Sequence, residues 1–137
     1  MKLFVNLLAM AVKQIRPTKA ELSILRVLWD IGPKTVREIQ NTLNETKPTG
    51  YTTVLKLLQI MTEKGLTTRE TLGIQHVYTA SLGEEGTQRQ LLKDLIERAF
   101  GGSMSKLVMQ ALAAKKASPE ELREIRRLLA RAREKKP

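Results

Sequence analysis

Residues 49–64, TGYTTVLKLLQIMTEK, decide the fold of this chain. Apolar residues recur there at positions i, i+3, i+4 and i+7, the spacing of one buried helix face, and they are Val54, Leu57, Leu58 and Met61. In front of them stand hydroxyl-bearing residues and no acid, where a helix leaves its backbone N–H groups unpaired. We therefore expect a helix with a buried side and a polar N-terminal tip, an arrangement that suits a DNA major groove.

Two helices are predicted before this one. The capping-box patterns Thr18-Lys19-Ala20-Glu21 and Thr35-Val36-Arg37-Glu38 predict helices over residues 19–30 and 36–43. The inward-facing positions expected in them are Leu22, Leu25, Leu28, Trp29, Val36, Ile39 and Leu43.

A β-hairpin is predicted after Gly65, because residues 66–71 and 75–80 are rich in Thr, Val and Tyr and are separated by a glycine-containing turn. Three helices followed by a hairpin form a winged helix. The chain is therefore expected to be mainly α, with a winged-helix DNA-binding domain over residues 16–80 whose third helix enters the groove and whose hairpin is the wing.

The remainder, residues 81–137, is predicted to be a three-helix dimerisation domain. Helices are expected over residues 84–100, from Ser103 onward, and from Pro119 to about Arg133. Fewer than 60 residues bury too little surface to be secure alone, so a second copy of the chain is the natural partner. The apolar positions expected at this interface are Leu91, Leu92, Leu95, Ile96, Phe100, Leu107, Val108, Leu112, Leu122, Ile125, Leu128 and Leu129.

The composition favours a polyanionic partner. The formal net charge is +10 and the pI is about 10.2. The excess is shared, with 11 basic and 6 acidic residues up to Ala80 and 13 and 8 after it, so charge does not tell which part binds. The chain has no cysteine and one histidine, which excludes disulfides, thiolate metal sites and thiol catalysis.

Residues 1–15 are expected to be an N-terminal extension. Residues 3–11 are largely apolar, and Ala9-Met10-Ala11 has the small-x-small form of a signal-peptidase site, but the stretch is too short to span a bilayer. Two interpretations are favoured over a signal: an amphipathic tail, or a misassigned start with Met10 as the true first residue.

Several segments resemble the penicillinase-repressor family, which includes the β-lactamase and methicillin-resistance repressors and their copper-responsive relatives. The most specific combination is Tyr51-Thr52-Thr53-Val54 with Phe100-Gly101-Gly102-Ser103. Further matches are Pro17-Thr18-Lys19-Ala20-Glu21-Leu22, Leu28-Trp29, Gly32-Pro33, Thr35-Val36-Arg37-Glu38-Ile39, Leu57-Leu58, Lys64-Gly65-Leu66, His76-Val77-Tyr78 and Ser118-Pro119-Glu120-Glu121-Leu122. The resemblance covers about residues 16–133.

This resemblance implies a cytosolic transcriptional repressor that binds palindromic double-stranded operators as a homodimer. In the antibiotic-resistance members, a membrane-bound sensor metalloprotease triggers cleavage in the dimerisation part and so releases the operator. The cleaved Asn-Phe pair is replaced here by Gln110-Ala111. The cysteine-rich tail of the copper-responsive members is absent, which excludes copper sensing through thiolates.

The residues expected to contact DNA lie on the predicted reading helix, before it, and in the wing. They are Thr35, Lys47, Thr49, Tyr51, Thr52, Thr53, Lys56, Arg69 and His76. Plainer interpretations remain open for some of them. Thr52 and Thr53 could simply cap their helix, Tyr51 could fill the core, and His76 could be an inert surface residue.

No catalytic constellation, phosphate loop or histidine-rich metal spacing is found in the sequence, so no enzyme activity and no cofactor are expected. The acids at the starts of the later helices complement the helix dipole, which explains them without chemistry. The alternative function is a winged-helix protein-interaction module that does not bind DNA.

Overall fold

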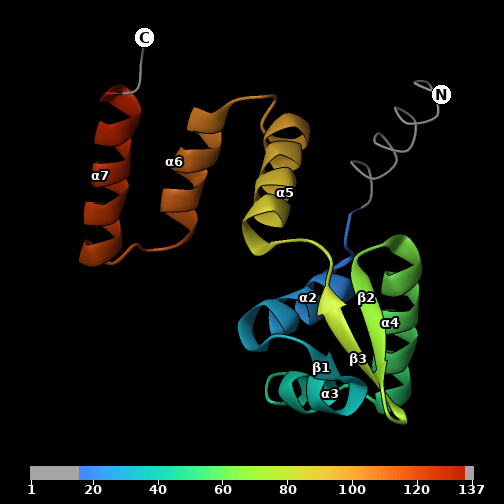
Figure 1. The fold of residues 1–137 in the computed structure, drawn as a ribbon. Helices are drawn as coiled ribbons and strands as arrows, with labels where there is room; N and C mark the ends of the chain where they lie inside the picture. Colours follow the sequence, from blue (N-terminus) through green and yellow to red (C-terminus); the bar gives the residue numbers. More distant parts are fainter. Residues whose placement is uncertain (1–15, 135–137) are drawn as a thin grey trace, which may run out of the picture. The chain divides into compact units, whose positions relative to one another are not determined.

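The computed structural model describes residues 16–134, so the predicted N-terminal extension over residues 1–15 lies outside them. The elements are α2 (Lys19–Ile31), β1 (Lys34–Thr35), α3 (Val36–Asn44), α4 (Tyr51–Lys64), β2 (Thr67–Leu72), β3 (Gln75–Ala80), α5 (Glu84–Ala99), α6 (Met104–Ala114) and α7 (Pro119–Glu134) (Figure 1). The chain divides into two compact units, one ending at Leu91 and the other beginning at Leu92. This division falls inside α5, later than the predicted domain boundary after Ala80.

The N-terminal unit is a winged helix, as predicted. Its antiparallel sheet has the order β1-β3-β2, and β2 pairs with β3 along its full length, from Thr67 opposite Ala80 to Leu72 opposite Gln75. Figure 1 shows the turn of this hairpin at the same end of the unit as the start of α4. The sequence did not reveal β1, because a strand of two residues is too short to show an alternating pattern.

The core of this unit joins its three helices and the wing. The fully buried side chains include Ile24 and Leu25 from α2, Ile39 from α3, Leu58 from α4 and Tyr78 from β3. The predicted stripe of α4 is largely confirmed, since Val54, Leu58 and Met61 are buried and Leu57 packs against them half-buried.

The predicted inner face of α2 was partly wrong. Leu25 and Leu28 are buried as predicted, and Trp29 packs half-buried against the core. Leu22 is only half-buried, whereas Ile24 and Val27, which were not predicted, are buried. The buried face of α2 begins with a charged residue, Glu21. Because an acid is not expected at a buried position, the hydrophobic pattern alone did not identify which side of α2 faces the core.

Glu21 is 1% exposed and joins the start of α2 to the end of α4. Its two carboxylate oxygens accept hydrogen bonds from Lys64 Nζ at 2.9 and 3.0 Å, and Oε1 also accepts the backbone N–H of Thr18 at 2.8 Å. Burial by itself raises the pKa of the Glu21 carboxyl, but the hydrogen bonds from Thr18 and Lys64 outweigh it and hold the pKa below its ordinary value. The ion pair thus fixes α4 against α2.

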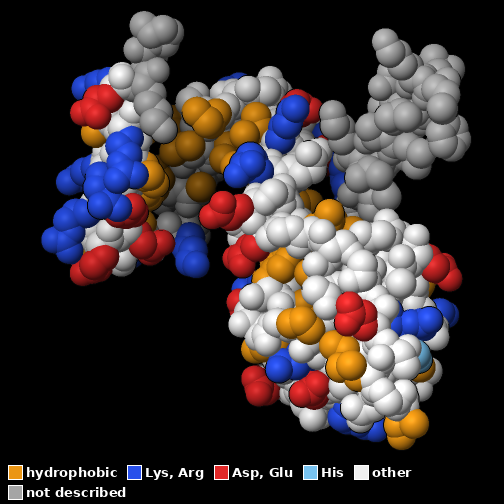
Figure 2. All heavy atoms as spheres, viewed as in Figure 1, with side chains coloured by type: hydrophobic (Ala, Val, Ile, Leu, Met, Phe, Trp, Pro, Cys, Tyr) orange, Lys and Arg blue, Asp and Glu red, His pale blue; other side chains and the backbone are white. Residues whose placement is uncertain are grey.

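The second unit holds the end of α5, with α6 and α7. Ser103 caps α6 by accepting the backbone N–H of Lys106 at 3.2 Å, and Ser118 forms a capping box with Glu121. Neither α6 nor α7 buries a single described side chain. Figure 2 shows hydrophobic side chains gathered over α6, at the surface of the unit.

Candidate nucleic-acid interface

The N-terminal tip of α4 is open to solvent. Its N-cap is Gly50, which gives no side-chain capping bond, and its first turn holds no acid. Tyr51, Thr52 and Thr53 are all exposed. The unpaired N–H groups and the positive end of the helix dipole therefore face outward beside two free hydroxyl groups, which is favourable for a phosphate or another anion.

The plain capping interpretation of Thr52 and Thr53 is wrong, because the cap of α4 lies at Gly50 and uses no side chain. Within residues 16–134 no hydrogen bond uses the hydroxyl group of either threonine, so both are open to a partner. Lys56, one turn further on, is also exposed, and no carboxylate of residues 16–134 pairs with it. Their contact with DNA stays a prediction.

The loop before α4 is held by side chains of α3. Thr49 donates its backbone N–H to Asn44 Oδ1 at 2.7 Å, and its carbonyl accepts from Gln40 Nε2 at 3.2 Å. The Thr49 hydroxyl donates to the carbonyl of Lys47 at 3.0 Å, so it also orders the loop. The Lys47 side chain is exposed. These bonds place the tip of α4 relative to α3.

Thr35 is the N-cap of α3, as predicted. Its hydroxyl accepts the backbone N–H of Glu38 at 3.3 Å, and the Glu38 carboxylate accepts the backbone N–H of Thr35 at 3.0 Å. The backbone N–H of Thr35 and its hydroxyl group both donate to the Glu38 carboxylate, and these two hydrogen bonds lower the pKa of that carboxyl. The Thr35 hydroxyl is thus occupied within the helix start, and any phosphate contact it makes would come from the backbone around it.

Sequence reasoning missed Arg37, Gln40 and Asn44 as parts of this surface. The Arg37 guanidinium carbon lies 4.6 Å from the centroid of the Tyr51 ring, and Nη1 donates to Gln40 Oε1 at 2.9 Å. The Tyr51 side chain is therefore a surface platform, and the interpretation that it fills the core is wrong, since it is 39% exposed. The spacing of Arg37 and Tyr51 in the chain gives no signal, because their contact depends on how α3 and α4 cross.

The two predicted wing residues occupy different places. His76 is exposed near the hairpin turn, where its Nδ1 lies 3.3 Å from Thr71 Oγ1 on the facing strand. Arg69 lies further along β2, opposite Tyr78, and lines a shallow groove with Thr62 and Glu63 of α4. The wing therefore does not bring Arg69 and His76 together as one phosphate site.

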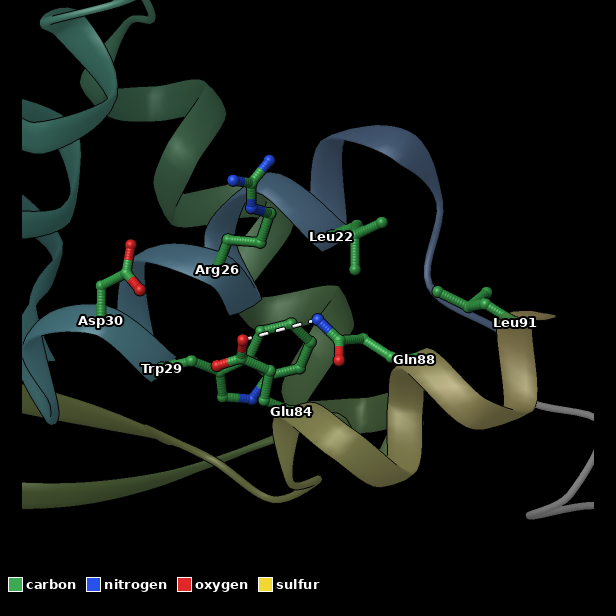
Figure 3. Close-up of a pocket in the computed structure, with 7 residues that line it drawn as sticks. All are labelled: Leu22, Arg26, Trp29, Asp30, Glu84, Gln88 and Leu91. Atoms are coloured by element: carbon green, nitrogen blue, oxygen red, sulfur yellow. Dashed lines mark hydrogen bonds between the residues drawn. The ribbon is translucent and has the colours of Figure 1, made fainter. Parts of the chain in front are cut away.

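A second groove, of about 300 Å³, lies between α2 and the start of α5 (Figure 3). Leu22 and Leu91 point toward one another there, and Trp29 donates its Nε1–H to the carbonyl of Leu82 at 2.8 Å. Leu91, predicted as a dimer contact, thus lies in the winged-helix unit. The remaining lining residues are Arg26, Asp30, Glu84 and Gln88, and all four are exposed.

Most of the other predicted dimer contacts are surface residues in the single chain. Leu92, Leu95, Val108, Leu112, Ile125, Leu128 and Leu129 are between 38% and 65% exposed, and Ile96, Phe100, Leu107 and Leu122 are half-buried. Among these helices α6 and α7 bury no described side chain, and exposed apolar surface of this extent is typical of an interface. None of the helices in residues 16–134 is long and apolar enough to cross a membrane.

Comparison with known proteins found similar chains that include two penicillinase repressors and one solved structure. The Staphylococcus aureus penicillinase repressor is 22% identical over 120 residues, covering 88% of this chain and 95% of that protein. The Bacillus licheniformis penicillinase repressor is 24% identical over 110 residues, covering 80% and 86%. A solution structure of monomeric Bacillus licheniformis BlaI in complex with the blaP half-operator is 24% identical and covers 52% of this chain and 87% of that one, with a TM-score of 0.46.

The family profile described as Penicillinase repressor matches residues 17–131, which span both units. The resemblance predicted from the tyrosine-threonine-threonine-valine segment and the glycine hinge is thereby confirmed. The chain belongs to the penicillinase repressor family of winged-helix, DNA-binding transcriptional repressors.

Proposed function

We propose that this protein represses transcription in the cytoplasm as a homodimer that binds a palindromic operator through the tip of α4. The observation that carries this proposal is the exposed, uncapped N-terminus of α4, with two free hydroxyl groups and no acid in its first turn. A net charge of +10 supports a polyanionic partner. Family membership supports the same function.

Dimerisation is supported by the apolar surface of α5, α6 and α7. Helices of a stable domain bury one stripe against the rest of the fold, yet α6 and α7 bury no side chain within a single chain. Covering a leucine side chain fully is worth about 1.5–3 kcal/mol. A second copy of the same helices is the occupant that we propose for this surface.

A two-fold symmetric dimer would place two α4 tips on the same side of a DNA duplex. Half-sites of such dimers lie one helical turn apart, roughly 34–36 Å, or at multiples of it. The operator is therefore expected to be an inverted repeat, with each half read by one protomer.

The experiment is a selection of binding sites from a pool of random-sequence duplexes with the full chain. The proposal expects an enriched inverted repeat, and equilibrium sedimentation of the complex should show two chains for each duplex. Enrichment of a single unpaired half-site would contradict the dimeric mode. If the protein binds no duplex even at low salt, the alternative of a protein-interaction module is correct and DNA binding is not its function.

We also propose that repression is relieved by proteolysis in the C-terminal helices, through a membrane-bound sensor metalloprotease. Family membership supports this route. Gln110 and Ala111 both lie exposed on α6 of the single chain. Intact-mass measurement of the repressor from induced cells would show two fragments separated within α5 or α6, whereas a full-length chain after induction would contradict cleavage.

A further inference from the structure

The first turn of α3 presents a cation beside the tip of α4. Arg37 is the second residue of α3 and is exposed. Among residues 16–134 no carboxylate pairs with its guanidinium, and the neighbouring Glu38 carboxylate is occupied by the backbone N–H and hydroxyl of Thr35. Its charge is therefore available to a partner from outside the chain.

The Arg37 side chain is held from two sides. The guanidinium carbon lies over the Tyr51 ring, 4.6 Å from the centroid, and Nη1 donates to Gln40 Oε1 at 2.9 Å. Gln40 in turn donates to the Thr49 carbonyl at 3.2 Å. Since Thr49 and Tyr51 flank the N-cap of α4, the guanidinium is fixed relative to the same helix tip that we propose to enter the groove.

Arginine suits such a position better than lysine does. A stacked guanidinium uses its face for the aromatic ring and keeps the N–H donors along its edge for an anion. Nη1 is occupied by Gln40, and no hydrogen bond within the described residues uses Nε or Nη2. A phosphate oxygen is the ligand that matches these donors at the edge of a DNA groove.

We propose that Arg37 is a further DNA-binding residue, a phosphate contact that the Tyr51 ring and the Gln40 amide hold in place beside the tip of α4. This inference rests on the proposed function, because it needs α4 to lie against DNA. Tyr51 then acts as a positioning residue through its ring rather than its hydroxyl group. Holding the guanidinium before binding reduces the entropy lost when the phosphate contact forms.

A phosphate contact differs from a base contact in what its removal changes. Loss of a phosphate contact weakens binding to every sequence about equally and reduces the slope of log affinity against log salt by about 1. Loss of a base contact lowers affinity for the operator and leaves affinity for random DNA unchanged.

The test measures fluorescence anisotropy of the selected operator and of a scrambled duplex over a series of KCl concentrations. Arg37→Ala should weaken the affinity for both duplexes by the same several-fold factor. It should also lower the slope of log affinity against log salt by about 1. Arg37→Lys should recover only part of the affinity. The matched control is Arg26→Ala, which removes the same charge from an exposed site on α2 and should leave the slope unchanged.

The role of Tyr51 is tested by a double-mutant cycle with Arg37. Arg37→Ala should reduce operator affinity by the same factor in a Tyr51→Phe background as in the wild type. In a Tyr51→Ala background it should reduce the affinity by a much smaller factor. Circular dichroism and thermal unfolding identify any variant that is misfolded. An equal cost in all three backgrounds would overturn the positioning role.

The outcomes separate this inference from the proposed function. If the wild type binds no duplex, the proposed function fails. If the wild type binds its operator and Arg37→Ala keeps the same salt slope, only the assignment of Arg37 fails. Loss of operator binding alone, with random-DNA binding intact, would overturn the phosphate contact in favour of base recognition.

Discussion

At the residue scale, the exposed N–H groups at the start of α4 depend on Gly50, which has no side chain that could cap the helix. A serine or threonine at the N-cap would occupy one of the first N–H groups of the helix, whereas Gly50 leaves them open. The hydroxyl groups of Thr52 and Thr53 are consequently extra polar groups rather than parts of the cap. The exposed lysine one turn later, Lys56, extends the same surface.

Thr53→Ala and Lys56→Ala should each weaken operator binding without unfolding the protein. Substitutions at exposed positions usually change stability by less than about 0.5 kcal/mol. Lys56→Ala should also lower the salt slope by about 1. Gel shifts at physiological salt measure the affinity, and Lys93→Ala, at an exposed position on α5, is the control. Wild-type binding by both variants would mean that α4 does not contact DNA.

Glu21 allows a prediction about pH. Its pKa is lowered in the folded chain, so its charge adds stability at pH values above the ordinary glutamate pKa of about 4.3, and this stability is lost as pH falls through the folded pKa. Glu21→Gln should destabilise the protein by about 1–2 kcal/mol at pH 7, a modest cost because the Lys64 side chain is 36% exposed.

Urea unfolding of the wild type and of Glu21→Gln at pH 7 and pH 3 measures this effect. The difference between the two proteins should shrink at pH 3. The Glu38 carboxyl titrates equally in both proteins and cancels in the comparison. A difference independent of pH would show that the charge of Glu21 is not what stabilises the fold.

At the scale of the elements, the sequence pattern predicted the helices and strands that have a regular hydrophobic period, but it did not predict features that depend on tertiary contacts. The extents of α4 and of the hairpin followed from a 3.6-residue stripe and from two runs rich in β-branched residues. The pattern did not predict three features: the two-residue strand β1, the inner face of α2, and the contact of Arg37 with Tyr51. Each of these depends on a neighbour distant in sequence: β1 on β3, Glu21 on Lys64, and Arg37 on the crossing of α3 and α4.

The end of α4 can be tested at Gly65, whose φ of +82° is unfavourable for any residue with a Cβ. A Cβ added there would meet no atom within 4 Å, so the cost of Gly65→Ala is purely conformational, about 1 kcal/mol. Gly83→Ala is the matched control, because its site is equally open and its φ is not positive. Equal unfolding midpoints for the two variants in urea would contradict a left-handed helix end at Gly65.

At the scale of the whole molecule, the proposed operator binding requires two copies of the chain. Leu95 is 47% exposed on α5 and lies in the middle of the proposed dimer interface. Leu95→Asp would place a charge against apolar side chains of the partner, so it should yield monomers in sedimentation velocity and bind operator much more weakly. Ile31→Asp, at a 41% exposed site on α2, should remain dimeric. Dimers of Leu95→Asp would show that the interface lies elsewhere.

The most direct measurement uses the absence of cysteine, which allows a DNA-cleaving iron chelate to be attached at one chosen residue. Gln59→Cys places the chelate on the exposed side of α4, and Ile31→Cys places it on α2 as the control. We expect the chelate on α4 to cut the operator in two clusters related by two-fold symmetry, with centres about one helical turn apart. Cleavage no stronger than that of the Ile31→Cys control, or a single cluster, would contradict a dimer that reads DNA through α4.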